Sequence, residues 1–264
     1  MMGRLAGRAR RKWRCRAAHP YHSRMVITID PRFCGPPTSA NGGYFVGVVA
    51  ALAKASVTVR LRKPPPLGVE IDVEDRGGDV LELRHAGELI AQTRPAEVSA
   101  PTLAPPTYVE AIEASRRCVG FAHHPFPTCF VCGPQRRRGD GLRIFPGALA
   151  RQSAASERPL VAAPWVPDDS LDAGNAKVRP EFMWAALDCP GWFAAVGDTR
   201  LALLGELTAH VDRCVHIGEE CVVVGWHVSS SGRSHQAGTA VFDEDGELCG
   251  YGLATWIEPR PAGP

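Results

Sequence analysis

The first half of the chain combines one stretch that is apolar on all sides with several stretches in which apolar residues alternate. Residues 44–55 (YFVGVVAALAKA) carry a single charge, at Lys54, and a helix that is apolar on every side is buried on every side. The strand-like runs that follow often place apolar residues at every second position, and they lie at 56–63, 67–76, 80–85 and 88–98. Proline or glycine turns separate them. The pattern predicts a buried helix followed by an antiparallel sheet.

The second half repeats this order. Residues 181–188 (EFMWAALD) form a short helix-like run that is again apolar nearly all round. Four strand candidates follow, at 200–213, 220–229, 234–243 and 248–257. Asp245-Gly246, between the last two, is a strong hairpin signal. Each half therefore predicts a helix followed by four strands, with one more strand before the helix, which in the first half is the run 26–30.

An apolar helix wrapped by an antiparallel sheet is the hotdog arrangement, and two such units in tandem would form a pseudo-dimer within one chain. The fold class predicted is therefore α+β, a tandem (double) hotdog, although another α+β fold fits the same periodicity. We expect the connection between the units to be irregular and to run over the surface, with one helical turn over 108–117, and we expect a loose polar stretch at 148–158. The predicted division is a basic leader at 1–24, an N-terminal unit at 25–100, a Pro/Arg-rich linker at 101–140, a C-terminal unit at 141–258 and a tail at 259–264.

Charge separates the first residues from the rest. The net charge of +2 hides eight Lys/Arg and no acid in residues 1–25, so the remainder carries 22 basic against 28 acidic residues. A mildly acidic body does not favour nucleic-acid binding. The leader lacks the apolar core of a secretory signal. An organellar transit peptide fits its charge, but we favour a disordered tail whose deletion leaves the melting temperature unchanged.

Several classes of protein are excluded or disfavoured by what the chain lacks. No stretch of 18 uninterrupted apolar residues is present, so no membrane span is expected. Nine cysteines, an odd number without a secretory signal, favour reduced thiols in a cytoplasmic protein. The chain has no GxSxG, GxxxxGK[ST] or HExxH motif, which argues against an α/β-hydrolase, a P-loop enzyme and a zincin.

Four short segments carry a resemblance to a known family. They are 39–44 (SANGGY) at the start of the first helix, 184–188 (WAALD), the closing hairpin 232–248, and 129–133 (CFVCG) with 141–145 (GLRIF). The first three are similar to the helix entry, the second-half helix with its Asp, and the last hairpin of the type II, double-hotdog acyl-CoA thioesterases. The fourth resembles a segment of other thioesterases of this fold. Their order along residues 26–258 is the family's order.

The resemblance implies thioester hydrolysis, which develops negative charge on the carbonyl oxygen. Unpaired N–H groups at a helix N-terminus can receive that charge, and Gly42 and Gly43 let a carbonyl approach the amide of Gly43 or Tyr44. A glycine-rich turn before a buried helix is the alternative reading. Asp188 is the one acid between Glu181 and Asp198 and would act as general base or nucleophile, unless it only caps its helix.

The two halves complement each other at this site. The first helix has Ala50 and Ala51 where an acid would fall, and the second has Arg179-Pro180 in place of the glycines, so one composite site between the units is expected. The resemblance further implies a polar partner on the adjacent strand, matched by Thr208, which is equally well an ordinary strand residue. The family's Gln on the last strand is missing, and Leu253 stands near its place, with Tyr251 and Thr255 nearby.

A metal site is a weaker prediction. Cys118, His123, His124, Cys129 and Cys132 follow the spacing C-x4-H-H-x4-C-x2-C, which can supply four zinc ligands. The alternative is a tight turn with small buried cysteines. We expect little or no stoichiometric metal, and no cofactor.

The sequence thus favours a cytoplasmic acyl-CoA thioesterase of lipid metabolism, acting on acyl-CoA or an acyl-carrier substrate. We expect neither a nucleic-acid partner nor a membrane span, and a homo-oligomer of pseudo-dimers is compatible with the fold. A hotdog hydratase or dehydratase would carry a His five residues after the Asp, where Phe193 stands. A non-catalytic acyl-ligand binding protein agrees with the missing Gln. The sequence leaves the acyl chain and the carrier open.

Overall fold

The computed structural model describes residues 25–53, 55–152, 158–197 and 200–260. The predictions for the leader 1–24, for most of the tail 259–264 and for the centre of the stretch 148–158 lie outside these residues.

The first unit wraps a five-stranded antiparallel sheet around one helix, in the strand order β1-β3-β4-β5-β2. Valine and other branched residues at alternating positions, such as Val57, Val59 and Ile71, are fully or almost fully buried and form the core with the helix. The elements are β1 (Met25–Thr28), a 3-10 turn (Pro31–Phe33), α1 (Gly42–Ala50), β2 (Val57–Leu61), β3 (Glu70–Asp75), β4 (Leu81–His85) and β5 (Glu88–Pro95).

The second unit has six strands in the order β8-β11-β10-β9-β7-β6 and a helix in two parts. Its elements are β6 (Gly147–Gln152), β7 (Pro159–Trp165), a 3-10 turn (Asp169–Leu171), α3 (Pro180–Ala186), α4 (Cys189–Ala195), β8 (Leu203–Val211), β9 (Cys221–Ser231), β10 (Ser234–Phe242) and β11 (Leu248–Ile257). Two expectations were wrong here. The stretch expected to be loose contains β6, and the second helical segment α4 continues beyond the predicted end at Asp188.

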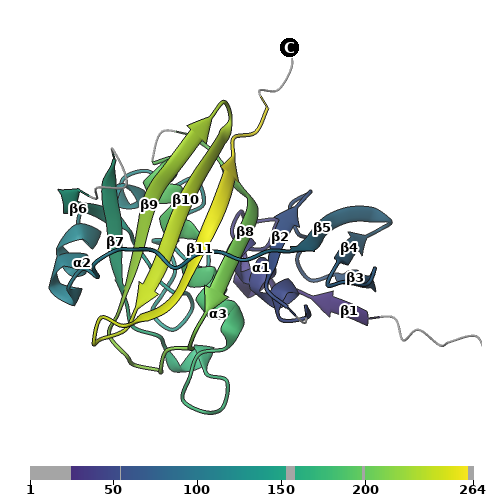
Figure 1. Cartoon of the computed structure of the whole chain (residues 1–264), viewed down its shortest axis with the longest axis horizontal. Coiled ribbons are helices and arrows are strands. Elements are labelled where there is room, and N and C mark those ends of the chain that lie inside the picture. The colour runs from purple at the N-terminus through teal and green to yellow at the C-terminus, as the bar shows by residue number, and fades with distance from the viewer. Residues whose placement is uncertain (1–24, 54, 153–157, 198–199, 261–264) are drawn as a thin grey trace, which may run out of the picture.

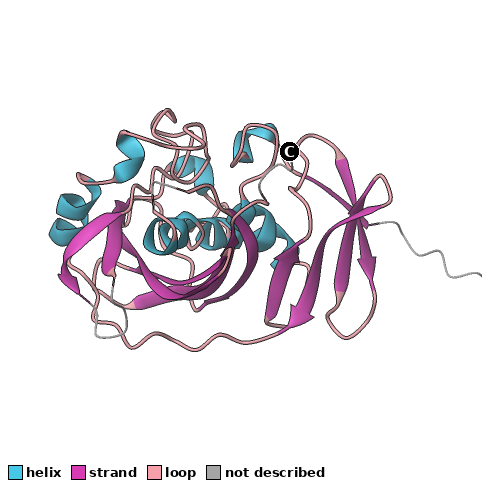
Figure 2. Cartoon of the chain, turned by 90° about the horizontal axis from the view of Figure 1, so that it is seen from above, coloured by secondary structure: helices cyan, strands magenta, loops and turns pink. Residues whose placement is uncertain are grey.

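The two units share one continuous sheet. Strands β2 and β8 pair antiparallel, with Thr58 opposite Thr208 and Arg60 opposite Glu206, so the described residues form a single 11-stranded sheet. Figure 1 shows the two units side by side, and Figure 2 shows central helices lying inside the curved sheets. The tandem hotdog prediction is confirmed.

The two central helices touch through glycines. A Cβ on Gly43 would lie 2.4 Å from the Cβ of Asp188, and one on Gly47 would lie 2.7 Å from the Cβ of Trp184. Gly43 and Gly47 are four residues apart and so lie on one face of α1. That face packs against α3 more closely than any side chain would allow.

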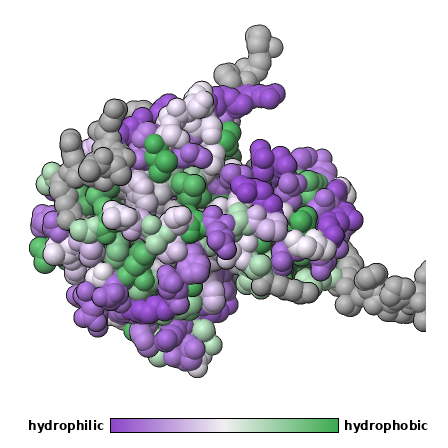
Figure 3. Space-filling view, in the orientation of Figure 1, coloured by the Kyte–Doolittle hydropathy of each residue, from purple (hydrophilic) through white to green (hydrophobic). Residues whose placement is uncertain are grey.

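The connection between the units is only partly what the sequence suggested. Residues 96–107 lack regular structure and cross the outer face of the second unit's sheet (Figure 1), before α2 (Tyr108–Ser115) begins at a Thr107–Glu110 capping box. Hydrophobic residues show between hydrophilic ones on this face (Figure 3), and Val228 and Leu253 on its strands are 45% and 36% exposed.

The expectation of a wholly surface-running linker was wrong, because its last part enters the core. After α2 and a 3-10 turn (Val119–Phe121), residues 129–132 are buried. Phe130 is fully buried among aromatic rings of both units, which compensates for burying an irregular backbone segment.

No helix in the described residues is long and apolar enough to cross a membrane.

Candidate functional site

Helix α1 starts at an asparagine cap. Asn41 is 2% exposed, and its Oδ1 accepts a hydrogen bond of 2.9 Å from the backbone N–H of Tyr44. Asparagine is among the preferred N-cap residues because its side chain satisfies one of the N–H groups that a helix start leaves unpaired. The cap leaves the Nδ2 group of Asn41 free to bind outside the helix.

Asp188 lies at the break between α3 and α4. Pro190 has no N–H, so the hydrogen-bond ladder of α3 cannot continue through it. The Oγ1 of Thr239 on β10 donates to the carbonyl of Leu187 at 2.8 Å, which gives this interrupted backbone a partner. The break turns the Asp188 side chain toward the start of α1.

The Asp188 carboxylate sits against the N-terminus of α1. Its Oδ2 accepts two hydrogen bonds of 2.9 Å, one from Asn41 Nδ2 and one from the backbone N–H of Gly43. A helix N-terminus favours a negative charge at this position. Asp188 is 1% exposed, and its Oδ1 has no hydrogen-bond partner among the described residues.

Burial raises the pKa of Asp188 to about 7. The neighbouring Cys129 acts in the same direction, whereas the hydrogen bonds from Gly43 and Asn41 act to lower the pKa. A carboxyl group with a pKa near the working pH both accepts and returns a proton readily. Asp188 is therefore a candidate general acid–base group.

A cavity of ≈ 320 Å³ opens beside Asp188 between the two units. Its walls are mostly apolar, and its lining includes three exposed basic residues, Arg62, Lys63 and Arg233, and, apart from Asp188, the acid Glu258, which pairs with Arg200. Lys63 pairs with Glu88 at 2.6 Å. The apolar lining includes Ala40, Leu61, Phe126, Trp192, Leu204 and Trp256. Such a cavity suits a ligand with an apolar group.

The structure brings Asp188 to the glycines at the start of α1, as the sequence predicted. The backbone amide that is free to bind a substrate there is, however, a different one from those the sequence suggested. The N–H of Gly43 is bonded to Asp188, and that of Tyr44 is bonded to Asn41, so neither predicted oxyanion donor is free. Gly42 lines the cavity, and within the described residues its N–H has no hydrogen-bond partner. The available donor at this helix start is therefore Gly42.

Two of the predicted site residues serve packing. The close contact with Asp188 requires Gly43 to be glycine, so its role is the approach of the two helices rather than of a substrate. The Tyr44 ring stacks on Phe33 with centroids 4.1 Å apart, and burial raises the pKa of Tyr44 to about 12. Tyr44 does not line the cavity.

Thr208 is not brought to Asp188. Leu207 and Ala209 on either side of it are buried toward the core, so Thr208 points to the opposite face of β8, where its hydroxyl lies 2.6 Å from that of Thr58. Leu253, registered opposite Thr208, shares that outer face. The residues of β11 that line the cavity are Trp256 and Ile257, and the Nε1 of Trp256 is buried without a partner among the described residues.

The metal candidates are also rearranged. Cys129 and Cys132 line the cavity together with Cys189, which the sequence did not single out. Cys118 does not belong to this group, and His123 is exposed. Asn41, Cys189 and Trp256 were thus missed. In the sequence, Asn41 could have been found from its place in the SANGGY motif, and Cys189 from its place next to Asp188. Nothing in the sequence marked Trp256 as a cavity residue.

Comparison with known proteins supports the architecture. No protein-family model and no curated protein matches the chain. The tesB protein of Mycobacterium avium subsp. paratuberculosis has a similar structure, with a TM-score of 0.59, 14% identity, and 90% of this chain and 93% of that chain covered. A "putative thioesterase II" from Thermobifida fusca gives a TM-score of 0.54 at 19% identity, with 92% and 96% covered.

A third similar structure is a protein of unknown function with a hot dog fold from Alicyclobacillus acidocaldarius. Its TM-score is 0.57 at 12% identity, and 92% of this chain and 96% of that chain are covered. Because these matches extend over nearly all of each chain, the resemblance to the double-hotdog proteins is confirmed for the fold.

Proposed function

We propose that this tandem hotdog chain hydrolyses acyl thioesters to a free acid and a thiol, at a composite site formed by α1 of the first unit and Asp188 of the second. The observation that carries the proposal is the buried carboxylate of Asp188, whose Oδ1 has no partner among the described residues, beside the amide of Gly42 and a mostly apolar cavity. The name of the Thermobifida fusca neighbour supports the same reaction class.

The reaction follows from these groups. The thioester carbonyl oxygen accepts a hydrogen bond from the N–H of Gly42, where the helix N-terminus stabilises developing negative charge. The Oδ1 of Asp188 takes a proton from a water molecule, and the hydroxide adds to the carbonyl carbon. When the tetrahedral intermediate collapses, the C–S bond breaks and the proton passes from Asp188 to the leaving sulfur. Asp188 is then ready for the next turnover.

The cavity indicates the substrate class. The acyl chain lies against the apolar lining, and the basic residues Arg62, Lys63 and Arg233 face the phosphates of a coenzyme A carrier. Acyl-CoA is therefore the proposed substrate. We expect acyl-CoA to be hydrolysed with a lower KM than the matching acyl-pantetheine, which lacks the nucleotide phosphates.

The test is Asp188→Asn, assayed by thiol release over a panel of acyl-CoA thioesters. The amide oxygen of an asparagine still accepts from Asn41 and Gly43, so the variant keeps the fold while losing the base. Loss of a positioned general base lowers kcat by a factor of roughly 10² to 10⁴. Asp172→Asn, at an exposed aspartate outside the cavity, is the control and keeps full turnover.

Wild-type turnover by Asp188→Asn on the best substrate would contradict the site. Tight acyl-CoA binding by the wild type without hydrolysis would replace the proposal with an acyl-ligand binding function.

A further inference from the structure

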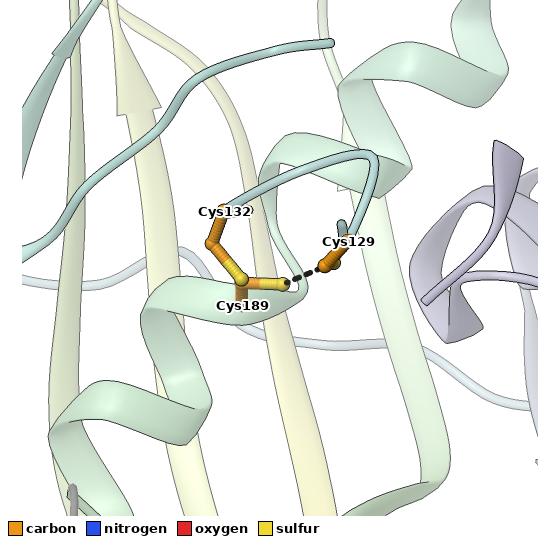
Figure 4. A group of neighbouring side chains, drawn as sticks. All are labelled: Cys129, Cys132 and Cys189. Carbon is orange, nitrogen blue, oxygen red and sulfur yellow. Dashed lines mark hydrogen bonds between the residues drawn. The ribbon is translucent and has the colours of Figure 1, made fainter. Parts of the chain in front are cut away.

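Three cysteine sulfurs converge at the wall of the cavity. Cys129 and Cys132 come from the buried end of the connection, and Cys189 is the first residue of α4. Their Sγ atoms all lie within 4.8 Å of one another, with 3.9 Å between Cys129 and Cys189, and all three residues are buried (Figure 4). Side chains from two distant parts of the chain thus point their sulfurs at one spot.

The turn that carries two of these sulfurs is tightly built. The N–H of Gly133 donates to the carbonyl of Cys129 at 2.9 Å, and a Cβ on Gly133 would lie 2.5 Å from the backbone nitrogen of Cys129. Only glycine fits this position. The C-x2-C-G turn therefore has the spacing and compactness that let two cysteines bind one ion.

Each sulfur also has a nitrogen donor beside it. Asn41 Nδ2 lies 3.8 Å from the sulfur of Cys129 and 3.9 Å from that of Cys189. His124 Nδ1 accepts from the N–H of Phe126, so the proton is on Nε2, which lies 3.2 Å from the sulfur of Cys132. N–H donors of this kind stabilise thiolates, and thiolates are the form that binds metal.

Packing alone does not account for this arrangement. A buried cysteine that only fills space behaves as a small apolar group, whereas these three have polar donors around them. A tetrahedral zinc ion with Zn–S bonds of about 2.3 Å holds its sulfurs about 3.8 Å apart. The 3.9 Å separation of Cys129 and Cys189 agrees with that geometry.

We infer that Cys129, Cys132 and Cys189 bind a zinc ion at the wall of the cavity that all three line, contrary to the expectation of little or no metal from the sequence. His124 is oriented as a hydrogen-bond donor to Cys132, and no other described His, Cys, Asp or Glu belongs to the group. Three protein ligands with an open position differ from a closed structural site. The ion links the connection to α4 and so fixes the segment that carries Asp188.

This inference goes beyond the proposed function, because metal binding is measurable whether or not thioesters are cleaved. The full-length protein, purified under reducing conditions without chelator, is analysed for zinc by mass spectrometry. We expect about one zinc per chain in the wild type, as three thiolate ligands at one spot predict. Cobalt added to the metal-stripped protein gives thiolate-to-cobalt charge-transfer bands in the near ultraviolet.

Two variants separate this site from general cysteine content. Cys189→Ser removes one ligand, and we expect it to lose most of the zinc and the charge-transfer intensity, with circular dichroism confirming that it folds. Cys118→Ser changes a buried cysteine outside the group and is expected to retain both.

A wild-type protein that is zinc-free as purified and binds no cobalt would overturn the inference, and this measurement needs no variant. Equal zinc content in Cys189→Ser and wild type would do the same. Loss of two titratable thiols in the denatured wild type would show a disulfide instead of a metal site.

Discussion

Asn41 connects the cap of α1 to Asp188, and its two functions can be separated by mutation. Asn41→Ser keeps a side-chain oxygen that can accept from the N–H of Tyr44, but it removes the Nδ2 donor that lies 2.9 Å from Asp188 Oδ2. Asn41→Ala removes both interactions. Comparing the two variants distinguishes the helix cap from the hydrogen bond to the carboxylate.

The expected magnitudes follow from the contacts. At a pH above 7, where Asp188 is charged, a hydrogen bond to this buried group contributes about 1.5–3 kcal/mol to the free energy of unfolding. An N-cap contributes about 1 kcal/mol. Asn41→Ser should therefore cost about 1.5–3 kcal/mol and Asn41→Ala about 1 kcal/mol more. In a chain of this size each kcal/mol lowers Tm by about 2–4 °C.

The assay is a double-mutant cycle in urea with Asn41→Ser, Asp188→Ala and the double variant. The cycle removes effects of Asn41 that do not involve Asp188, such as its contacts with the sulfurs of Cys129 and Cys189. Asn41→Ser should cost less by about 1.5–3 kcal/mol when Asp188 is already absent. Additive effects, within about 0.5 kcal/mol, would refute the pairing of Asn41 with the carboxylate.

Two further predictions concern the scaffold. Gly47→Ala should lower the free energy of unfolding by about 1–3 kcal/mol despite the helix propensity of alanine, because the new Cβ would lie 2.7 Å from that of Trp184. A urea midpoint above the wild type's would contradict this. Burial acts to raise the pKa of Asp243, but hydrogen bonds from Arg213 and from the backbone N–H of Glu247 hold this pKa below its ordinary value. This stabilisation is present at neutral pH and is lost as the pH falls through the folded-state pKa. Asp243→Asn should therefore lower the free energy of unfolding by about 1.5–3 kcal/mol at neutral pH, and by progressively less below about pH 4. Urea midpoints measured across pH test this, and a difference that does not depend on pH would contradict it.

The helices and strands were largely predictable because their signals are local. The apolar run at residues 44–55 and the alternating strands that follow are repeated in the second half, and repeated periodicity is a strong indication of tandem units. Predictions failed where the signal was weak. Strand β6 lies in a stretch without clear alternation, and α4 has Pro190 as its second residue, although a proline after an apolar helical run normally marks a helix end.

The composition of the site depended on tertiary structure. The sequence marked Asp188 and the glycines before α1, but it assigned the glycines to substrate approach, whereas Gly43 makes room for Asp188 itself. Thr208 matched by position along the chain, yet the alternation of β8 turns it to the other face of the sheet. Which face a strand residue occupies depends on register, which sequence spacing alone does not determine.

The sequence by itself determined the two hotdog units and their buried helices, because hydrophobic periodicity acts within each segment. Only the tertiary structure brought Asn41, Asp188 and the three cysteines Cys129, Cys132 and Cys189 to one wall of the cavity. Their positions along the chain span the connection and both central helices. Contacts between such distant segments arise from the packing of α1 against α3 and from the burial of the cysteine turn, which no local pattern encodes.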